Sequence, residues 1–128
     1  MILYILYNAD LLEIARAMTN DQDPKEDSVG FVDDAMIIVT RRTLKGNIKA
    51  LTNIMEKAGG GFTWAKDHNS RFKIDKLAVV HYTRKAVKDP LRLGKMKRQK
   101  APPLLLQGQI VKDKESYKYL GIHIDRNL

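Results

Sequence analysis

The sequence predicts an α+β domain in which an antiparallel sheet packs on helices, and three observations lead to this class. The chain has 128 residues, of which 44% are hydrophobic, so it fits about one domain with a buried core and not a disordered segment. Apolar residues recur with helical spacing in two early segments, whereas the later segments are short β-branched runs. The resulting order of helix, hairpin, helix and strands differs from the alternation expected of a βαβ fold.

The first expected element is a helix, because apolar residues recur at the spacing of one buried helix face, at Leu11, Ile14, Ala15 and Met18. Residues 19–27 are polar, contain Pro24 and indicate a loop. In residues 28–40, two short apolar runs flank the pair Asp33 and Asp34. This pattern predicts a β-hairpin with both carboxylates at its tip.

A second helix is expected where apolar residues recur over four turns, at Leu44, Ile48, Leu51, Met55 and Ala58. Three glycines at 59–61 are expected to end this helix. Residues 62–71 are mixed in pattern, and the aromatic residues Phe62 and Trp64 are expected to fill the core beside the helix end. Residues 72–83 predict one or two strands.

The C-terminal third contains two further strand candidates, residues 104–111 and 117–125, separated by the turn-like residues 112–116. A basic connection that contains proline, residues 84–103, precedes them. These strands are expected to complete the sheet of the α+β domain.

Composition excludes several classes of protein. The chain has no cysteine, which excludes disulfides, a zinc ribbon and thiol catalysis. No stretch approaches the roughly 18 apolar residues of a membrane span, and the apolar start lacks the basic region of a signal peptide. The histidines His68, His81 and His123 are too far apart for a histidine metal site, and His68 is expected to cap or fix a loop. We expect an intracellular protein without a membrane partner, with the nucleus as one option and the oligomeric state open.

Charge divides the chain into two parts. Residues 1–40 carry 2 basic and 8 acidic side chains, whereas residues 41–128 carry 21 basic and 7 acidic ones. Residues 84–100 alone hold 8 positive charges and one negative charge. This asymmetry predicts a polyanionic partner for the C-terminal part. An acidic cluster beside a basic tract suits a metal-dependent enzyme that acts on nucleic acid, although an ordinary charged loop would give the same composition.

The adjacent carboxylates of Asp33 and Asp34 are the main candidates for chemistry. Two ionised carboxylates between apolar strands disfavour each other, and a divalent cation compensates for this. Mg2+ prefers a few carboxylate oxygens, and two such ions about 3.5–4 Å apart serve phosphoryl transfer. One alternative is a solvated pair on a turn. Another is the phospho-acceptor pocket of a receiver domain, which is less favoured because residues 35–39 continue as a strand and not as a helix.

Four blocks of the sequence, in the same order, resemble the reverse transcriptases of non-LTR, LINE-type retrotransposons. Residues 30–34 (GFVDD) resemble their catalytic aspartate box, and residues 3–8 (LYILYN) resemble the helix before that box. Residues 68–72 (HNSRF) with 76–78 (KLA) resemble the next block, and residues 116–125 (SYKYLGIHID) resemble the hairpin that follows the palm. The resemblance covers nearly the whole chain and implies the C-terminal part of a polymerase palm, with the aspartate hairpin at the centre of its sheet.

The resemblance implies roles for individual residues. Asp33 is expected to be a catalytic metal ligand and Asp34 to support or share the metal site, with Mg2+ or Mn2+ as the cofactor. Phe31 stands where such enzymes often carry tyrosine near the primer terminus. Lys76 takes the place of a lysine suggested to protonate the leaving pyrophosphate. The residues expected in the primer-grip hairpin are Tyr119, Leu120 and Gly121.

The resemblance also implies partners and parts that lie elsewhere. An intact polymerase of this kind is a nucleotidyltransferase that uses an RNA template, a DNA primer and deoxynucleoside triphosphates. In the family, another metal-binding aspartate and the fingers lie upstream of this region and the thumb follows it, so these 128 residues are expected to be inactive alone. The alternatives are a non-catalytic basic nucleic-acid-binding module and a degenerate mobile-element remnant.

The basic tract at 84–100 is a second candidate surface. Its candidate binding residues are Lys85, Lys88, Arg92, Lys95, Lys97, Arg98 and Lys100. They are expected to make sequence-independent contacts with phosphates, which give a salt-dependent affinity. The tract has no aromatic residue, so it lacks the stacking platform of a single-strand binder. A solvated loop is the alternative.

Overall fold

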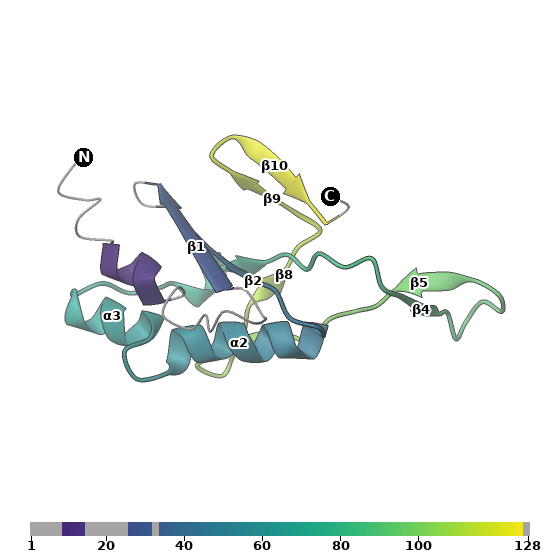
Figure 1. Ribbon diagram of the computed structural model, residues 1–128, viewed down its shortest axis with the longest axis horizontal. Coiled ribbons are helices and arrows are strands. Elements are labelled where there is room, and N and C mark those ends of the chain that lie inside the picture. The colour runs from purple at the N-terminus through teal and green to yellow at the C-terminus, as the bar shows by residue number, and fades with distance from the viewer. Residues whose placement is uncertain (1–8, 15–25, 32–33, 127–128) are drawn as a thin grey trace.

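A computed structural model describes residues 9–14, 26–31 and 34–126 of the chain (Figure 1). These residues form a mixed α and β structure with small sheets, which agrees with the expected combination of helices and strands. The sheet is divided more finely than expected. The described residues contain five two-stranded sheets, of which four are antiparallel and one is parallel.

Helix α2 (Leu44–Glu56) is the longest described helix and forms where the apolar spacing predicts it. It begins after Thr43, whose side-chain oxygen accepts a hydrogen bond from the Gly46 N–H at 3.0 Å. Such a cap satisfies one of the free N–H groups in the first turn of a helix. The earlier helix is present at residues 9–14, and its remaining positions at 15–18 lie outside the described residues.

Helix α3 (Gly61–Asp67) was not predicted, because it begins at the last of three glycines and its residues show a mixed pattern. The glycines serve close packing between the two helices. A Cβ atom at Gly60 would lie 2.6 Å from the Ile54 carbonyl oxygen, and one at Gly61 would lie 2.7 Å from the Met55 sulfur. Helix α2 ends at Glu56 with Lys57 as its cap, which is before the glycines that were expected to end it, and the run lets α3 begin directly against α2.

The aromatic residues of α3 pack as predicted. Trp64 is buried, and Phe62 is partly buried against the core and meets the Phe72 ring edge-on. His68 ends α3, stacks on the Trp64 ring at 4.5 Å and places its Nδ1 2.9 Å from the Trp64 carbonyl oxygen. The prediction that His68 caps or fixes a loop is confirmed.

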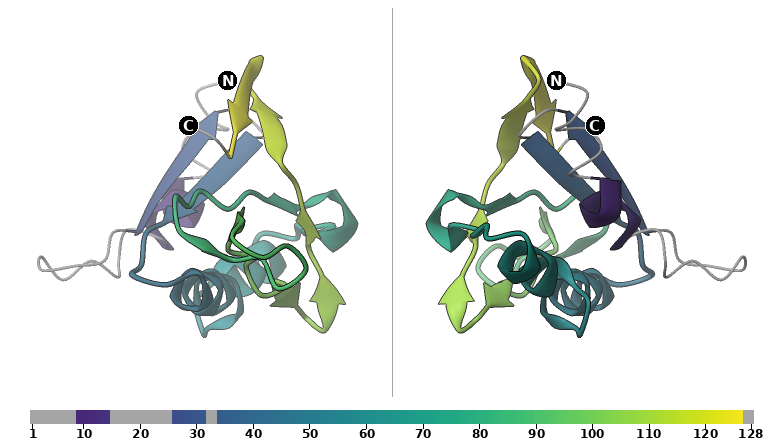
Figure 2. Two further views of the ribbon diagram at one scale, coloured as in Figure 1. Left: turned by 90° about the vertical axis from the view of Figure 1, so that its right-hand side faces the viewer. Right: turned by 90° about the vertical axis from the view of Figure 1, so that its left-hand side faces the viewer.

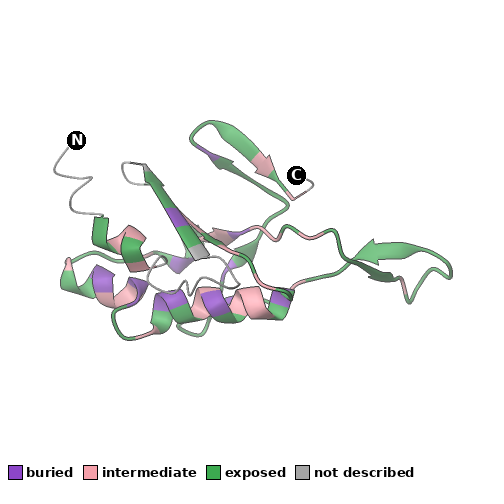
Figure 3. Ribbon diagram, in the orientation of Figure 1, coloured by how far each residue is buried: buried purple, intermediate pink, exposed green. Residues whose placement is uncertain are grey.

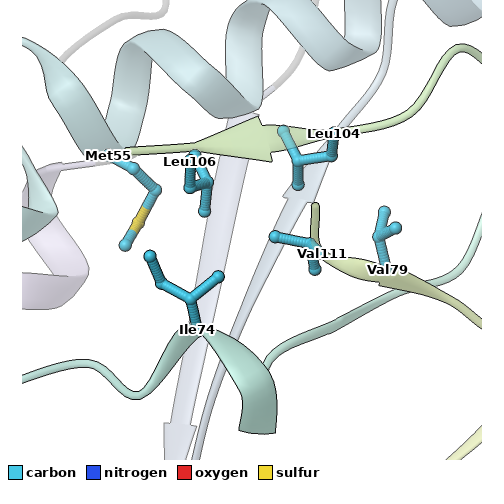
Figure 4. Packing of buried hydrophobic residues seen from close by; sticks show 6 residues of the cluster. All are labelled: Met55, Ile74, Val79, Leu104, Leu106 and Val111. Atoms are coloured by element: carbon cyan, nitrogen blue, oxygen red, sulfur yellow. The ribbon is translucent and has the colours of Figure 1, made fainter. Parts of the chain in front are cut away.

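The main core lies between the two helices and the short strands near them (Figures 3 and 4). Its buried members come from five separate segments: Met55, Ile74, Val79, Leu104, Leu106 and Val111. Strand β3 (Ala78–Val79) runs parallel to β8 (Lys112–Asp113), and the 3-10 helix η1 (Ile74–Lys76) precedes β3. Residues 72–83 thus hold one short strand, and part of the expected turn at 112–116 is a strand.

The two C-terminal strand candidates are each a hairpin and not a single strand. Strands β6 (Leu105–Leu106) and β7 (Gln109–Ile110) form the first, and β9 (Ser116–Tyr119) and β10 (Ile122–Asp125) form the second. Both hairpins turn through two residues with positive φ: Gln107 and Gly108, and Leu120 and Gly121. Such turns match the twist of paired strands, and a pattern of apolar residues alone does not reveal them.

The basic connection also forms a hairpin, from β4 (Ala86–Lys88) and β5 (Met96–Arg98). It extends from one end of the molecule, away from the helices, as Figure 1 shows. Among the helices of the described residues, none has the length and apolar character that crossing a membrane requires.

Candidate metal and nucleic-acid site

Strands β1 (Glu26–Phe31) and β2 (Asp34–Val39) pair with each other in the region where a hairpin was expected around the aspartates. They are antiparallel, with Phe31 opposite Asp34. Asp34 is the first residue of β2 and is exposed to solvent. Asp33 lies between the two strands and outside the described residues, so the expected pair of carboxylates is described only at Asp34.

The middle of β1 and its end near the turn approach the helix at residues 9–14. The Ser28 hydroxyl is buried and donates a hydrogen bond to the Leu12 carbonyl. A Cβ atom at Gly30 would lie 3.0 Å from a methyl group of Leu12. These contacts hold β1 close to the helix. They therefore help to fix the position of the residues at the end of the hairpin.

The β9–β10 hairpin lies on the same side of α2 and α3 as β1–β2 (Figures 1 and 2). The two are joined directly, because the Tyr119 hydroxyl donates a hydrogen bond of 3.3 Å to the Val29 carbonyl. Burial raises the pKa of Tyr119, and the nearby negative charge of Asp34 raises this pKa further. Two blocks separated by 90 positions in the sequence therefore meet beside Asp34.

The turn of the β9–β10 hairpin carries backbone strain. Leu120 has a φ of 49° and Gly121 a φ of 84°. Glycine adopts positive φ freely, whereas a leucine there is uncommon and costs about 1–2 kcal/mol. Leu120 is also half exposed, so burial of its side chain does not compensate for this strain. Tyr119 is thus the packed residue of the predicted primer-grip set, and Leu120 and Gly121 form an exposed turn.

A cavity of about 430 Å3 lies between the β1–β2 hairpin, α2, β3 and the β9–β10 hairpin. Apolar side chains such as Ile37, Leu51 and Val79 line most of it, and Tyr119 is part of its wall. Lys76 lies at the end of η1, is exposed and contributes to the cavity wall together with Ala35, the residue after Asp34. The structure therefore places Lys76 on the cavity that β2 also lines.

Within the described ranges, no three His, Cys, Asp or Glu side chains come together in a group that could hold a metal ion. The exposed carboxylate of Asp34 fits the role of one ligand in a site that takes its other ligands from water and phosphate. Phe31 is described only through its backbone, as the partner of Asp34 in the strand register.

The predicted phosphate-contacting residues lie along the β4–β5 hairpin and its two connections. All seven are exposed: Lys85, Lys88, Arg92, Lys95, Lys97, Arg98 and Lys100. The structure adds detail that the sequence did not predict. The Lys85 ammonium donates to the Arg42 carbonyl at 2.9 Å and so joins the base of the hairpin to the start of α2. The Lys97 ammonium lies 3.8 Å from the Asp89 carboxylate.

No protein-family model, curated protein or solved structure matches this chain.

Proposed function

We propose that the chain is part of the palm of a reverse transcriptase, which catalyses metal-dependent, template-directed DNA synthesis when it is complete. The observation that carries this proposal is the hydrogen bond between Tyr119 and Val29. In the polymerases that the sequence resembles, the aspartate box and the following hairpin act together at the primer end. A contact between these two segments beside Asp34 supports the same arrangement here.

Asp33 and Asp34 would hold Mg2+ or Mn2+. When bound, such ions lower the pKa of the attacking primer 3′-hydroxyl and stabilise the leaving oxygen of pyrophosphate. The chain itself would position the reacting groups. Tyr119 supports the β1–β2 hairpin from the side, and the exposed ammonium of Lys76 could donate a proton to pyrophosphate. The basic hairpin would bind phosphates of the primer and template without reading their sequence.

The test is the binding of Mn2+ to the 128-residue chain, followed by electron paramagnetic resonance with a primer–template duplex present. We expect Mn2+ to bind and the double variant Asp33→Asn/Asp34→Asn to lose this binding, while the duplex affinity stays within about threefold. Asp67→Asn is the matched control, because Asp67 is an exposed carboxylate at the end of α3. Equal Mn2+ binding by the double variant and the wild type would contradict the proposal.

Primer extension with an RNA template gives a second measurement. We expect no DNA synthesis by the 128 residues alone, because the upstream aspartate and the fingers of the family are not among them. Robust synthesis would contradict this part of the proposal.

A non-catalytic nucleic-acid-binding module is the second candidate, and the exposed basic hairpin favours it. In that case, the affinity for a duplex would fall steeply with salt, but Mn2+ would have no effect and the aspartate variants would behave as wild type. The same titrations therefore separate the two functions.

A further inference from the structure

The turn of the β4–β5 hairpin carries large apolar side chains that nothing in the described chain covers. Leu91 is 90% exposed and Leu93 is 105% exposed, and Met96 on β5 is 61% exposed. Single exposed leucines are common on protein surfaces. Two fully exposed leucines that are separated by an arginine, at the end of a projecting hairpin, form a local apolar tip.

The turn that holds these leucines has its own hydrogen bonds and lies outside the buried core. The Asp89 carboxylate accepts a hydrogen bond from the Leu91 N–H at 3.0 Å, and the Asp89 N–H donates to the Lys95 carbonyl at 2.8 Å. The Arg92 carbonyl accepts from Lys95 at 3.1 Å, and Gly94 has a φ of 77°. Local hydrogen bonds therefore stabilise the backbone of the turn, and this turn carries Leu91 and Leu93.

Positive charge surrounds the tip. Lys88, Arg92 and Lys95 lie near the leucines in sequence and are exposed, and Figure 3 shows strands β4 and β5 as exposed. The single acidic residue of the segment, Asp89, is occupied in the turn and lies near Lys97. The tip thus combines an apolar contact with a cationic rim, which suits a polyanion that also offers an apolar surface.

We infer that the β4–β5 hairpin is an arm that binds a nucleic-acid duplex, with its basic residues on the phosphates and with Leu91 and Leu93 inserted as an apolar wedge at a base step. This inference deepens the proposed function and rests on it for the identity of the duplex as primer and template. The wide, shallow minor groove of an A-like RNA–DNA duplex leaves the base edges accessible to such an arm. In proteins that bind the minor groove, aliphatic side chains enter between base steps and partly unstack them.

Two observations favour a duplex over other anionic partners. A single-strand binder needs aromatic rings for stacking, and residues 84–100 contain none. The two strands of the arm also differ from an amphipathic helix, the element that usually binds a lipid surface. The experiment below includes vesicles so that a lipid partner would be detected.

The experiment uses the full 128-residue chain and an RNA–DNA duplex that carries 2-aminopurine at internal positions of the DNA strand. This base fluoresces more strongly when it is unstacked. We expect saturating wild-type protein to raise its fluorescence at least twofold. The double variant Leu91→Ser/Leu93→Ser is expected to bind within about threefold of wild type and to give no rise.

Two further variants separate the wedge from the charge. Ile110→Ser removes an exposed apolar side chain outside the arm and should behave as wild type. The triple variant Lys88→Gln/Arg92→Gln/Lys95→Gln should reduce the slope of log affinity against log salt by about 3, because about one counterion is released for each phosphate contact. The leucine variant should keep the wild-type slope.

A bound wild-type protein that leaves the fluorescence unchanged would overturn the inference, and so would a leucine variant that still raises it. Leucine-dependent binding to phosphatidylserine vesicles without a fluorescence change would assign the arm to a membrane surface instead. If the Mn2+ test fails but the fluorescence result holds, the arm binds duplexes in a protein without polymerase chemistry. If the Mn2+ test succeeds and the fluorescence result fails, only the wedge is wrong.

Discussion

The packed body around α2 and the β4–β5 arm use the same residue type in opposite ways. Leu106 in the body is 2% exposed, whereas Leu93 in the arm is 105% exposed. In the body, leucine stabilises the fold because its surface is removed from water. In the arm, local hydrogen bonds hold the turn and the leucines remain in solvent.

The difference shows that the body provides the buried surface that stabilises the fold, whereas the arm provides exposed apolar and basic side chains. The core gathers buried residues between Met55 and Val111, so it ties together segments that lie far apart in the sequence. The arm can change its side chains with little effect on that core. Substitutions that disturb the body should therefore lower the free energy of unfolding, and matched substitutions in the arm should not.

The largest effect on stability is expected from Leu106→Ala. This variant leaves a cavity in the core and should lower the free energy of unfolding by about 2–5 kcal/mol. Leu91→Ala is the matched substitution in the arm and should change it by less than about 0.5 kcal/mol. Urea unfolding followed by circular dichroism measures both. Similar losses in the two variants would show that the arm packs on the body in solution.

Glycine substitutions give the next comparison. Gly60→Ala places a Cβ atom 2.6 Å and 2.8 Å from the carbonyl oxygens of Ile54 and Lys57, so the backbone between the two helices must shift. We expect the free energy of unfolding to fall by about 1–3 kcal/mol. Gly94→Ala meets no atom within 4 Å, although its φ of 77° is unfavourable for alanine. Local opening of the arm should release the strain in Gly94→Ala. If Gly94→Ala lowered the free energy of unfolding as much as Gly60→Ala, the arm would not be independent of the body.

The cap of α2 gives a smaller effect within the body. Thr43→Ala removes the acceptor for the Gly46 N–H, and this should cost about 1 kcal/mol. Thermal unfolding detects the change as a lower midpoint. Thr43→Ser keeps the hydroxyl and serves as the control. An unchanged midpoint in Thr43→Ala would mean that water replaces the cap without loss.

The smallest effect is expected from the pH dependence that His81 contributes. Burial lowers the pKa of His81, and Arg126 lowers it further, although the carboxylate of Asp113 opposes both. The folded protein therefore binds this proton less readily than the unfolded chain does. The contribution of His81 to stability is present above the ordinary pKa of about 6.5 and is lost as the pH falls below it.

His81→Gln tests this contribution directly. The loss of stability between pH 7.5 and pH 5.5 should be smaller in the variant than in the wild type, as measured by urea unfolding at the two pH values. His123→Gln is the control, because His123 is exposed on β10. If His81→Gln and the wild type lost the same stability between pH 7.5 and pH 5.5, His81 would not be a source of this pH dependence.

Much of the local structure could be predicted from short stretches of sequence. The spacing of Leu44, Leu51 and Met55 predicts α2, and the two apolar runs predict the strands on either side of the aspartates. The candidate site was predicted only in part. Asp34 was expected at the tip of a hairpin and is the first residue of β2. Its neighbour Tyr119 was expected near the primer from a resemblance and not from any local signal.

Other features could not be predicted because they depend on contacts between distant residues. The start of α3 within a glycine run depends on the approach of Gly61 to Met55. The basic tract was expected as a connection, and its pairing of Ala86 with Arg98 makes it a hairpin instead. The apolar tip at Leu91 and Leu93 is visible only when burial is known.

The sequence by itself determined the helix periodicity, the strand-forming runs and the separation of acidic and basic charge, because these depend on residues within a few positions of one another. The tertiary structure alone decided that Tyr119 meets Val29, that the core collects Met55 with Val111, and that two leucines remain in solvent. Which apolar residues become buried depends on loop closure over tens of residues. The free energy of that closure is set by the whole packed chain and not by any one segment.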